Sequence, residues 1–353
     1  MREFKINKSK IGDNSSCYIV AEMSANHGGD IGKAIEIIHS AKESGADAVK
    51  LQTYRADTIT LDSEKEDFRL ANDNPWENYK TLYSLYENAF TPWEWHRKLF
   101  DEGKKIGIDI FSSPFDCTAV DFLEKINTPA YKIASPEITD VPLIKAVART
   151  GKPVILSSGL STIDDIELAI DTLEVNGCSD YALLKCTTAY PAPPEDINLK
   201  TIPDFIDKFN CIAGISDHSI GTEISIAAVA LGAKIIEKHF VLSKNDKSVD
   251  SFFSLCPEEF KKMVDEVRVV EKALGIIDYT IPSSAKENIM ALRSLYVTEN
   301  IKKGDIVTSK NVKSVRPSYG LHPKHYENIL GKTVSKDLNK GDRFELDFID
   351  IKE

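Results

Sequence analysis

Residues 211–240 read CIAGISDHSIGTEISIAAVALGAKIIEKHF, and this stretch contains the repeating unit from which the fold is predicted. An apolar run, Cys211–Ile215, ends in the polar cluster Ser216–His218. A helix-like segment, Glu223–Leu231, follows, and a second apolar run then ends in Glu237–His239. A strand, a helix and another strand in this order predict a βαβ unit with parallel strands.

The same unit recurs towards the N-terminus. Eight apolar runs end in polar side chains, and they lie at Tyr18–Ala21, Ala48–Val49, Gly107–Phe111, Ala130–Tyr131, Pro153–Leu156, Tyr181–Leu184, Cys211–Ile215 and Ile235–Ile236. Eight strands that alternate with helices predict an α/β fold, the (β/α)8 TIM barrel. Because the active site of such a barrel is built from the C-terminal strand ends, the polar clusters predict an enzyme.

Composition restricts the classes of partner and the compartment. The 353 residues carry a net charge of −11, which argues against nucleic acid or an anionic membrane as partner. No apolar run approaches the ~18 residues of a transmembrane helix, and the start lacks the apolar core of a signal peptide. The six cysteines are scattered without a CxxC spacing. We therefore expect a cytoplasmic protein without disulfides or a zinc–thiolate site.

The chain is long enough for about two domains. We expect a catalytic barrel over residues 1–280, a linker over 281–290 and a small β-rich domain over 291–353. The tail repeats a Lys-Gly-Asp turn between apolar runs, at 303–305 and 340–342, which indicates internal symmetry. Within the barrel, the connection between Gln52 and Thr91 is unusually long and partly aromatic. It is either a lid over the binding site or a helical insertion that packs on the barrel.

Several motifs in one order resemble the sialic acid synthase family. They are Ala21–His27, Lys50–Thr53, Tyr131–Glu137, Ser216–Ser219 and Glu237–Phe240, and the tail resembles the family's antifreeze-like (SAF) domain. Within the family, the resemblance is strongest to pseudaminic acid synthases, on the segments Arg293–Tyr296, Val315–Pro323 and Tyr86–His96. The resemblance implies a metal-dependent condensation of phosphoenolpyruvate with an acetamido sugar. It also implies a homodimer in which each SAF domain reaches the partner's barrel.

Two histidines, His218 and His239, end the seventh and eighth strands, which are neighbours in a closed barrel. A divalent metal there would polarise the sugar aldehyde without proton transfer. Together with the resemblance, this position predicts a site for Mn²⁺, Mg²⁺ or Co²⁺, with carboxylate and water completing the shell. His27 also lies at the barrel mouth and is a substrate or supporting residue instead.

The remaining site residues follow mainly from the resemblance. It implies that phosphoenolpyruvate is held by Lys50, Ser113, Lys132, Ser135, Ser157 and Ser216. It implies sugar contacts from Gln52, Glu137, Tyr190, Asp250 and, across the dimer, Arg316. Thr188 replaces the family's usual Asn and keeps a donor without the amide. Lys185 ends the sixth strand, and its side chain either enters the site or points away from it.

Glu22 and Glu137 are the candidates for acid–base chemistry, because both follow strand ends. Three alternatives stay open. The enzyme could use another acetamido sugar and make N-acetylneuraminic or legionaminic acid. It could be a barrel enzyme acting on a phosphorylated sugar, or a metal aldolase. It could also be a non-catalytic sugar-acid-binding protein.

Overall fold

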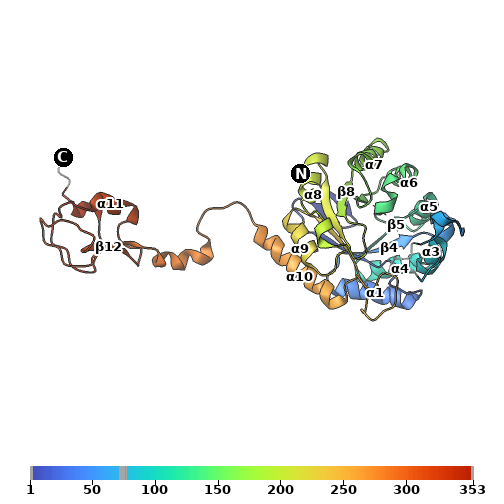
Figure 1. Ribbon diagram of the computed structural model, residues 1–353, viewed down its shortest axis with the longest axis horizontal. Coiled ribbons are helices and arrows are strands. Elements are labelled where there is room, and N and C mark those ends of the chain that lie inside the picture. Colours follow the sequence, from blue (N-terminus) through green and yellow to red (C-terminus); the bar gives the residue numbers. More distant parts are fainter. Residues whose placement is uncertain (1–2, 71–75, 77, 351–353) are drawn as a thin grey trace. The chain divides into compact units, whose positions relative to one another are not determined.

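The computed structural model describes residues 3–70, 76 and 78–350. The chain divides into two compact units, one that ends at Gly275 and one that begins at Ile276. In the first unit, eight parallel strands close into a barrel in the order β10-β3-β4-β5-β6-β7-β8-β9, and helices surround them (Figure 1). These strands are β3 Tyr18–Glu22, β4 Ala48–Thr53, β5 Asp109–Pro114, β6 Tyr131–Ile133, β7 Val154–Ser157, β8 Tyr181–Cys186, β9 Ile212–Asp217 and β10 Ile235–His239. The predicted (β/α)8 barrel is confirmed.

The helices begin and end where local sequence signals place them. Asp30 precedes α1 and accepts hydrogen bonds from two backbone N–H groups of its first turn, and Gly107 ends α4 in a left-handed conformation. The less regular stretch after Pro194 contains its expected helix, α8. The helices around the strands are α1 Ile31–Glu43, α4 Trp93–Ile106, α5 Cys117–Lys125, α6 Val141–Ala148, α7 Ile163–Val175, α8 Thr201–Phe209, α9 Glu223–Ala230 and α10 Pro257–Leu274.

Side chains of each strand alternate between the barrel interior and the helices, as the two-residue period of a strand requires. In β10, Ile235 belongs to the interior cluster and Ile236 to the cluster under the helices. The N-terminal hairpin, β1 Glu3–Ile6 with β2 Ser9–Gly12, adds Phe4, Ile6 and Ile11 to the interior cluster. This hairpin therefore closes the N-terminal end of the barrel, opposite the predicted site.

The long connection between β4 and α4 contains two helices and a 3₁₀ turn. They are α2 Ala56–Ile59, η1 Glu66–Phe68 and α3 Leu82–Ala89. Thr81 begins α3 with a reciprocal pair of hydrogen bonds to Ser84, which fixes the start of the helix. Residues 71–75 and 77 of this connection lie outside the described part of the chain.

The second unit is small and rich in extended structure. An antiparallel pair, β11 Ser294–Val297 with β12 Val312–Val315, packs over its own apolar core. An isolated bridge joins Ile301 to Leu338, so the two copies of the internal repeat pair with each other. The short helices are η4 Ser283–Ala291, η5 Pro323–His325, α11 Tyr326–Ile329 and η6 Leu346–Phe348. Across residues 3–70, 76 and 78–350, no helix combines the length and apolar character that crossing a membrane requires.

Candidate active site

A cavity of about 320 Å³ lies at the C-terminal ends of the barrel strands. Most of the predicted site residues line it, namely Glu22, Lys50, Gln52, Lys132, Ser135, Ser157, Thr188, Tyr190, Ser216, His218, His239 and Asp250. Strand alternation explains this convergence. In β4, Ala48 belongs to the interior cluster, Val49 and Leu51 pack under the helices, and Lys50 therefore turns inward.

Four charged side chains form the floor of the cavity. Lys50 pairs with Glu22 at 2.5 Å and lies 3.6 Å from Glu237, and Lys132 lies 3.4 Å from Glu237. All four are almost completely buried. This carboxylate–ammonium cluster supplies two cations within reach of an anion bound above it.

The two floor carboxyls have opposite pKa shifts. Burial raises the pKa of Glu22, although Lys50 opposes the shift. For Glu237, the same effect of burial is outweighed by Lys132 and Lys50, and its pKa falls below the usual range. Environments that separate the pKa values of two carboxyls in this way are typical of acid–base sites. Of the two, Glu22 is the easier to protonate, whereas the two lysines favour the charged form of Glu237.

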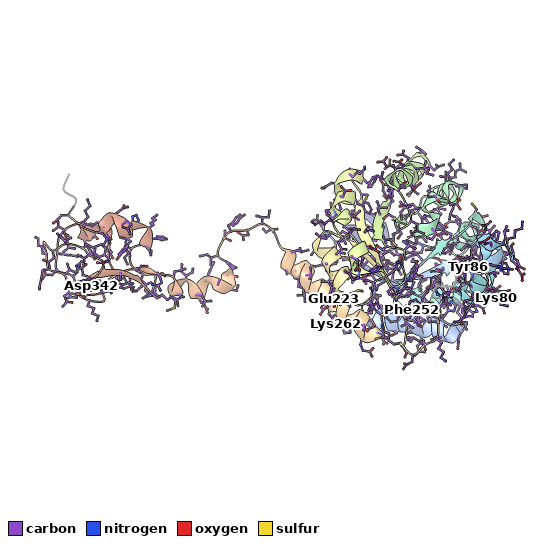
Figure 2. The ribbon with its side chains drawn as sticks, viewed as in Figure 1. Lys80, Tyr86, Glu223, Phe252, Lys262 and Asp342 are labelled. Carbon is purple, nitrogen blue, oxygen red and sulfur yellow. The ribbon has the colours of Figure 1, made fainter. Side chains whose placement is uncertain are left out.

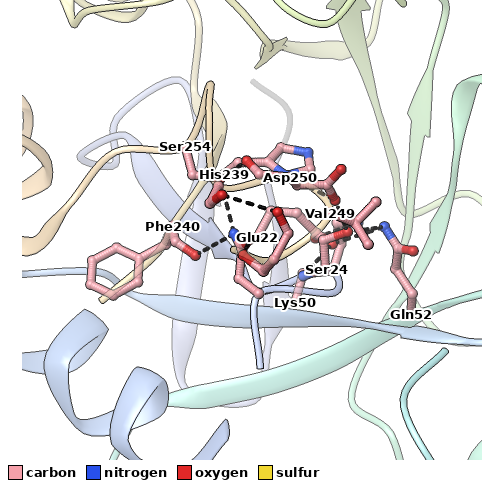
Figure 3. Close-up of polar contacts among 12 residues, drawn as sticks. Glu22, Ser24, Lys50, Gln52, His239, Phe240, Val249, Asp250 and Ser254 are labelled. Carbon is pink, nitrogen blue, oxygen red and sulfur yellow. Dashed lines mark hydrogen bonds and ion pairs between the residues drawn. The ribbon is translucent and has the colours of Figure 1, made fainter. Parts of the chain in front are cut away.

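A hydrogen-bond network joins the floor to the loop after β10 (Figure 3). Gln52 donates to Glu22 at 3.1 Å and to the hydroxyl of Ser24 at 3.1 Å. Ser24 in turn donates to the carboxylate of Asp250. Asn26 donates to the carbonyl of Phe240 at 2.8 Å. These bonds hold Asp250, 228 residues from Glu22 in the sequence, at the mouth of the same cavity.

The two predicted metal-binding histidines face each other, with ring centroids 5.3 Å apart. His218 Nδ1 donates to the carbonyl oxygen of Thr187 at 3.0 Å, which leaves Nε2 as the ring atom that would bind a metal. Burial alone would lower the pKa of this ring, but Cys186 and the Thr187 carbonyl outweigh it and raise that pKa. His239 Nδ1 is buried, has no hydrogen-bond partner among the described residues, and lies 3.8 Å from Asp250. Burial and the nearby His218 lower the pKa of His239 well below its usual value, so this ring is neutral.

These imidazoles fit a divalent cation, but the protein offers few further ligands. In the part of the chain that the structure describes, no group of three or more His, Cys, Asp or Glu side chains is arranged to hold a metal. Two histidine nitrogens would therefore share the ion with water or substrate oxygens, an arrangement found in open, catalytic sites rather than closed, structural ones.

Hydroxyl groups surround the floor on one side. Ser135 accepts from Thr188 at 2.9 Å, and Ser216 donates to Glu237 at 3.2 Å. The hydroxyl of Ser157 is buried without a partner among the described residues. A side chain at Gly159 would meet Ser135 Oγ at 2.6 Å, so this close approach requires glycine. Ser135 and Ser157 therefore keep hydroxyl hydrogens that can be donated to an anion, whereas the hydrogen of Ser216 is already donated to Glu237.

Three predicted residues lie outside the lining. Ser113, which lies opposite Gln52 in the register of β4 and β5, accepts a hydrogen bond from Lys50 at 3.3 Å. Glu137 follows β6 in the short helix η2 Ser135–Thr139, and burial raises its pKa to about 7. Arg316 follows β12 in the second unit and is exposed to solvent. Its predicted contact with a partner's site stays a prediction.

Lys185, which the sequence leaves open, does not line this cavity, and its ammonium donates to the carbonyl of Cys186 at 2.7 Å. His27 is buried against Trp95 and bonds to Thr91, so it supports the mouth from outside the lining. Sequence reasoning missed Glu237 as a site residue. The two-residue period of β10 could have identified Glu237. It occupies alternate positions with Ile235, which points into the barrel, and His239, which lines the cavity.

Comparison with known proteins identifies the family. The NeuB family profile matches residues 37–279, and the SAF domain profile matches residues 293–344. A pseudaminic acid synthase from Campylobacter jejuni subsp. jejuni serotype O:23/36 (strain 81-176) is 47% identical over 94% of this chain and 96% of the relative. A pseudaminic acid synthase from Helicobacter pylori is 44% identical, covering 94% and 97% of the two chains.

Solved structures agree. The spore coat polysaccharide biosynthesis protein spsE of Bacillus subtilis is 33% identical, with a TM-score of 0.68 and full coverage of both chains. An N-acetylneuraminic acid synthetase from Leptospira borgpetersenii is 32% identical, with a TM-score of 0.72 over 82% of this chain and 95% of that one. The resemblance read from the motifs is confirmed. The chain belongs to the NeuB family and carries a C-terminal SAF domain.

Proposed function

We propose that this chain is a pseudaminic acid synthase, a carbon–carbon-bond-forming transferase. It would condense phosphoenolpyruvate with 2,4-diacetamido-2,4,6-trideoxy-L-altrose and water, and release pseudaminic acid and phosphate. Relatives named pseudaminic acid synthase, 44% to 47% identical over most of both chains, support this choice of sugar. The reaction type is supported by the family to which the chain belongs.

One observation carries the proposal, the placement of two buried ammonium groups beside two imidazoles in one cavity. Phosphoenolpyruvate has a phosphate and a carboxylate, and both need charge-assisted donors. Lys50 and Lys132, with the hydroxyls of Ser135, Ser157 and Ser216, supply such donors at the floor. The sugar would then lie above, towards Gln52, Tyr190 and Asp250.

In the condensation, C3 of phosphoenolpyruvate attacks the sugar's aldehyde carbon, and water adds at C2 before phosphate leaves. His218 and His239 would hold Mn²⁺, Mg²⁺ or Co²⁺, which supplies a Lewis acid for the aldehyde oxygen when bound. Glu22, which neighbours His239 in the register of β3 and β10, would take a proton from the attacking water, and that proton would pass to the alkoxide oxygen formed from the aldehyde. Glu137, with a pKa of about 7, can exchange a proton near the sugar under neutral conditions.

We further propose a homodimer in the cytoplasm, in which Arg316 completes the partner's site. The second unit has only a small apolar core of its own, and a domain of this size is marginal alone, which favours a partner surface for it. All six cysteines are free thiols, as a reducing compartment permits.

A substrate panel tests the proposed function. Phosphate release is measured with phosphoenolpyruvate, Mn²⁺ and one of three sugars, the altro sugar, its manno isomer or N-acetylmannosamine. We expect the highest kcat/KM with the altro sugar. Faster turnover of the manno isomer would reassign the chain to legionaminic acid synthesis, the activity in the names of relatives 36% to 37% identical. Faster turnover of N-acetylmannosamine would reassign it to N-acetylneuraminic acid synthesis.

The same panel excludes the more distant functions. Turnover of a phosphorylated sugar in preference to all three would indicate a different class of barrel enzyme. Binding of phosphoenolpyruvate and sugar by calorimetry, without any phosphate release in Mn²⁺, would indicate a non-catalytic binding protein.

A further inference from the structure

The apolar face of α3 lines the active-site cavity instead of packing into a core. Leu82, Leu85, Tyr86 and Ala89 have the i, i+3, i+4, i+7 spacing of one helical face, and all four line the cavity. Leu85 and Ala89 are buried, yet they belong to none of the three hydrophobic clusters formed by the described residues. An amphipathic helix normally buries this face in a hydrophobic core, whereas this face of α3 forms part of the wall of the cavity.

Neighbouring segments extend this surface and hold it in place. Leu70, Phe115 and Val249 add further apolar lining, and the rings of Tyr54 and Tyr86 contact edge to face at 5.6 Å. In the rest of this subsection, the α3 wall means Leu82, Leu85 and Ala89.

Two tryptophan hydrogen bonds hold the insertion that carries the wall. Trp76 donates to the carbonyl of Val249 at 3.0 Å, and Trp93 donates to the carbonyl of Tyr54 at 3.1 Å. The opposite side of α3 is polar, since Glu87 and Asn88 are exposed. Tyr86, on the same helix, is labelled in Figure 2. The wall is therefore a formed surface of the cavity.

The cavity has two chemically different halves. The strand ends contribute charged and hydroxyl groups, and the insertion after β4 contributes alkyl side chains. A ligand that fills both halves must have an ionic or hydroxylated end and an apolar end. Among the candidate sugars, those of the trideoxy series have a methyl group at C6 where N-acetylmannosamine has a hydroxymethyl group.

We propose that the α3 wall receives the C6 methyl group of the sugar and thereby selects 6-deoxy sugars over 6-hydroxy sugars. This inference rests on the proposed function and assigns its specificity to Leu82, Leu85 and Ala89. These side chains offer no hydrogen-bond donor or acceptor. A hydroxyl placed against them loses its water without gaining a partner, whereas a methyl group gains contact.

The test uses two sugars that differ only at C6, the 6-deoxy altro sugar and its 6-hydroxy counterpart. The ratio of their kcat/KM values is measured for the unmodified enzyme, Leu82→Asn and Leu85→Asn, which replace an alkyl group by an amide of similar size. We expect a ratio of about 10 to 200 for the unmodified enzyme, since one group in an apolar pocket discriminates by about this factor. Each variant should reduce the ratio by about 10-fold.

Controls separate recognition from folding. Leu61→Asn makes the same change at a side chain of the same insertion that is 64% exposed, and it should leave the ratio unchanged. Leu82→Met keeps an apolar side chain and should retain the preference. The KM for phosphoenolpyruvate should stay the same in all variants, because its donors come from the strand ends.

The inference is overturned if the unmodified enzyme turns over both altro sugars equally well, or if Leu82→Asn and Leu85→Asn keep the full ratio. In both cases turnover of the altro sugar would still uphold the proposed function. Failure of the proposed function looks different, because the unmodified enzyme would then turn over neither altro sugar, and the inference would fall with it.

Discussion

The buried ion pair between Asp217 and Lys238 joins the ends of the two strands that carry the cavity imidazoles. The two residues are neighbours in the register of β9 and β10, their charged atoms are 2.9 Å apart, and both side chains are 1% exposed. Each residue immediately precedes one of the imidazoles in the sequence. We predict that Lys238→Met destabilises the barrel and weakens metal binding, because it releases the strand ends that carry His218 and His239.

The contacts of the pair set the size of the effect. In Lys238→Met the Asp217 carboxylate keeps three hydrogen-bond donors. They are the backbone N–H of Ser219 at 2.9 Å, the hydroxyl of Ser219 at 2.5 Å and the hydroxyl of Ser225 at 2.7 Å. Removing one partner of a buried pair costs about 3–5 kcal/mol of unfolding free energy. Since these three donors remain, we expect a loss near the lower end, about 3 kcal/mol.

The assay is urea denaturation, which gives the free energy of unfolding, together with calorimetric titration of Mn²⁺. Lys261→Met is the matched control, because Lys261 pairs with Asp265 at the same 2.9 Å but on an exposed helix surface. That change should cost no more than about 0.5 kcal/mol. The double variant Asp217→Asn with Lys238→Met should lose less than the sum of the single losses. The reasoning is refuted if Lys238→Met is as stable as Lys261→Met.

Three further outcomes are expected. Chelation by EDTA should abolish phosphate release. His218→Ala or His239→Ala should weaken Mn²⁺ binding, measured by calorimetry, by at least about 10-fold. Undiminished Mn²⁺ binding in the double variant would show that these residues do not form the metal site. The Arg316→Ala and Glu22→Ala variants should each be inactive alone. A mixed dimer of the two variants has one site with both changes and one site with neither, so it should recover about half the activity of an unmodified dimer. No recovery, once subunit exchange is demonstrated, would show that Arg316 does not serve the partner. The pKa of Glu137 in the folded protein, about 7, exceeds its ordinary value of 4.5. Between these pH values the folded state binds more protons than the unfolded state, so the free energy of unfolding should fall as the pH rises from 5 to 7. Glu137→Gln should flatten this slope when both proteins are denatured at pH 5 and pH 7, and an unchanged slope would assign it to other groups.

The polar strand ends were predictable because a strand's two-residue period and barrel closure are strong constraints. Lys50, Lys132, Ser216 and His218 follow apolar runs, and closure brings such positions to one mouth. The same two-residue period places the Glu237 side chain inside the barrel. The sequence prediction did not include it, because it stands next to other polar residues at the strand end.

Other features depend on packing that the sequence does not encode locally. The helical spacing of Leu82 and Leu85 is the same whether the helix packs on a core or lines a cavity. The structure, in which both side chains line the cavity, is therefore needed to choose between a lid over the site and an insertion packed on the barrel. The side chain of Lys185 bonds to a nearby carbonyl, and its strand-end position alone did not exclude the site. The predicted role of Arg316 concerns a second copy of the chain, which one chain does not contain.

The N-terminal hairpin has a kinetic consequence for the proposed reaction. Phe4, Ile6 and Ile11 seal one end of the barrel, so ligands exchange with solvent at the opposite mouth. Under the proposed function, phosphoenolpyruvate occupies the floor beneath the sugar. A sugar that arrives first would then obstruct the route to Lys50 and Lys132. Initial-rate measurements should therefore follow a compulsory order, with phosphoenolpyruvate binding first and the sugar second.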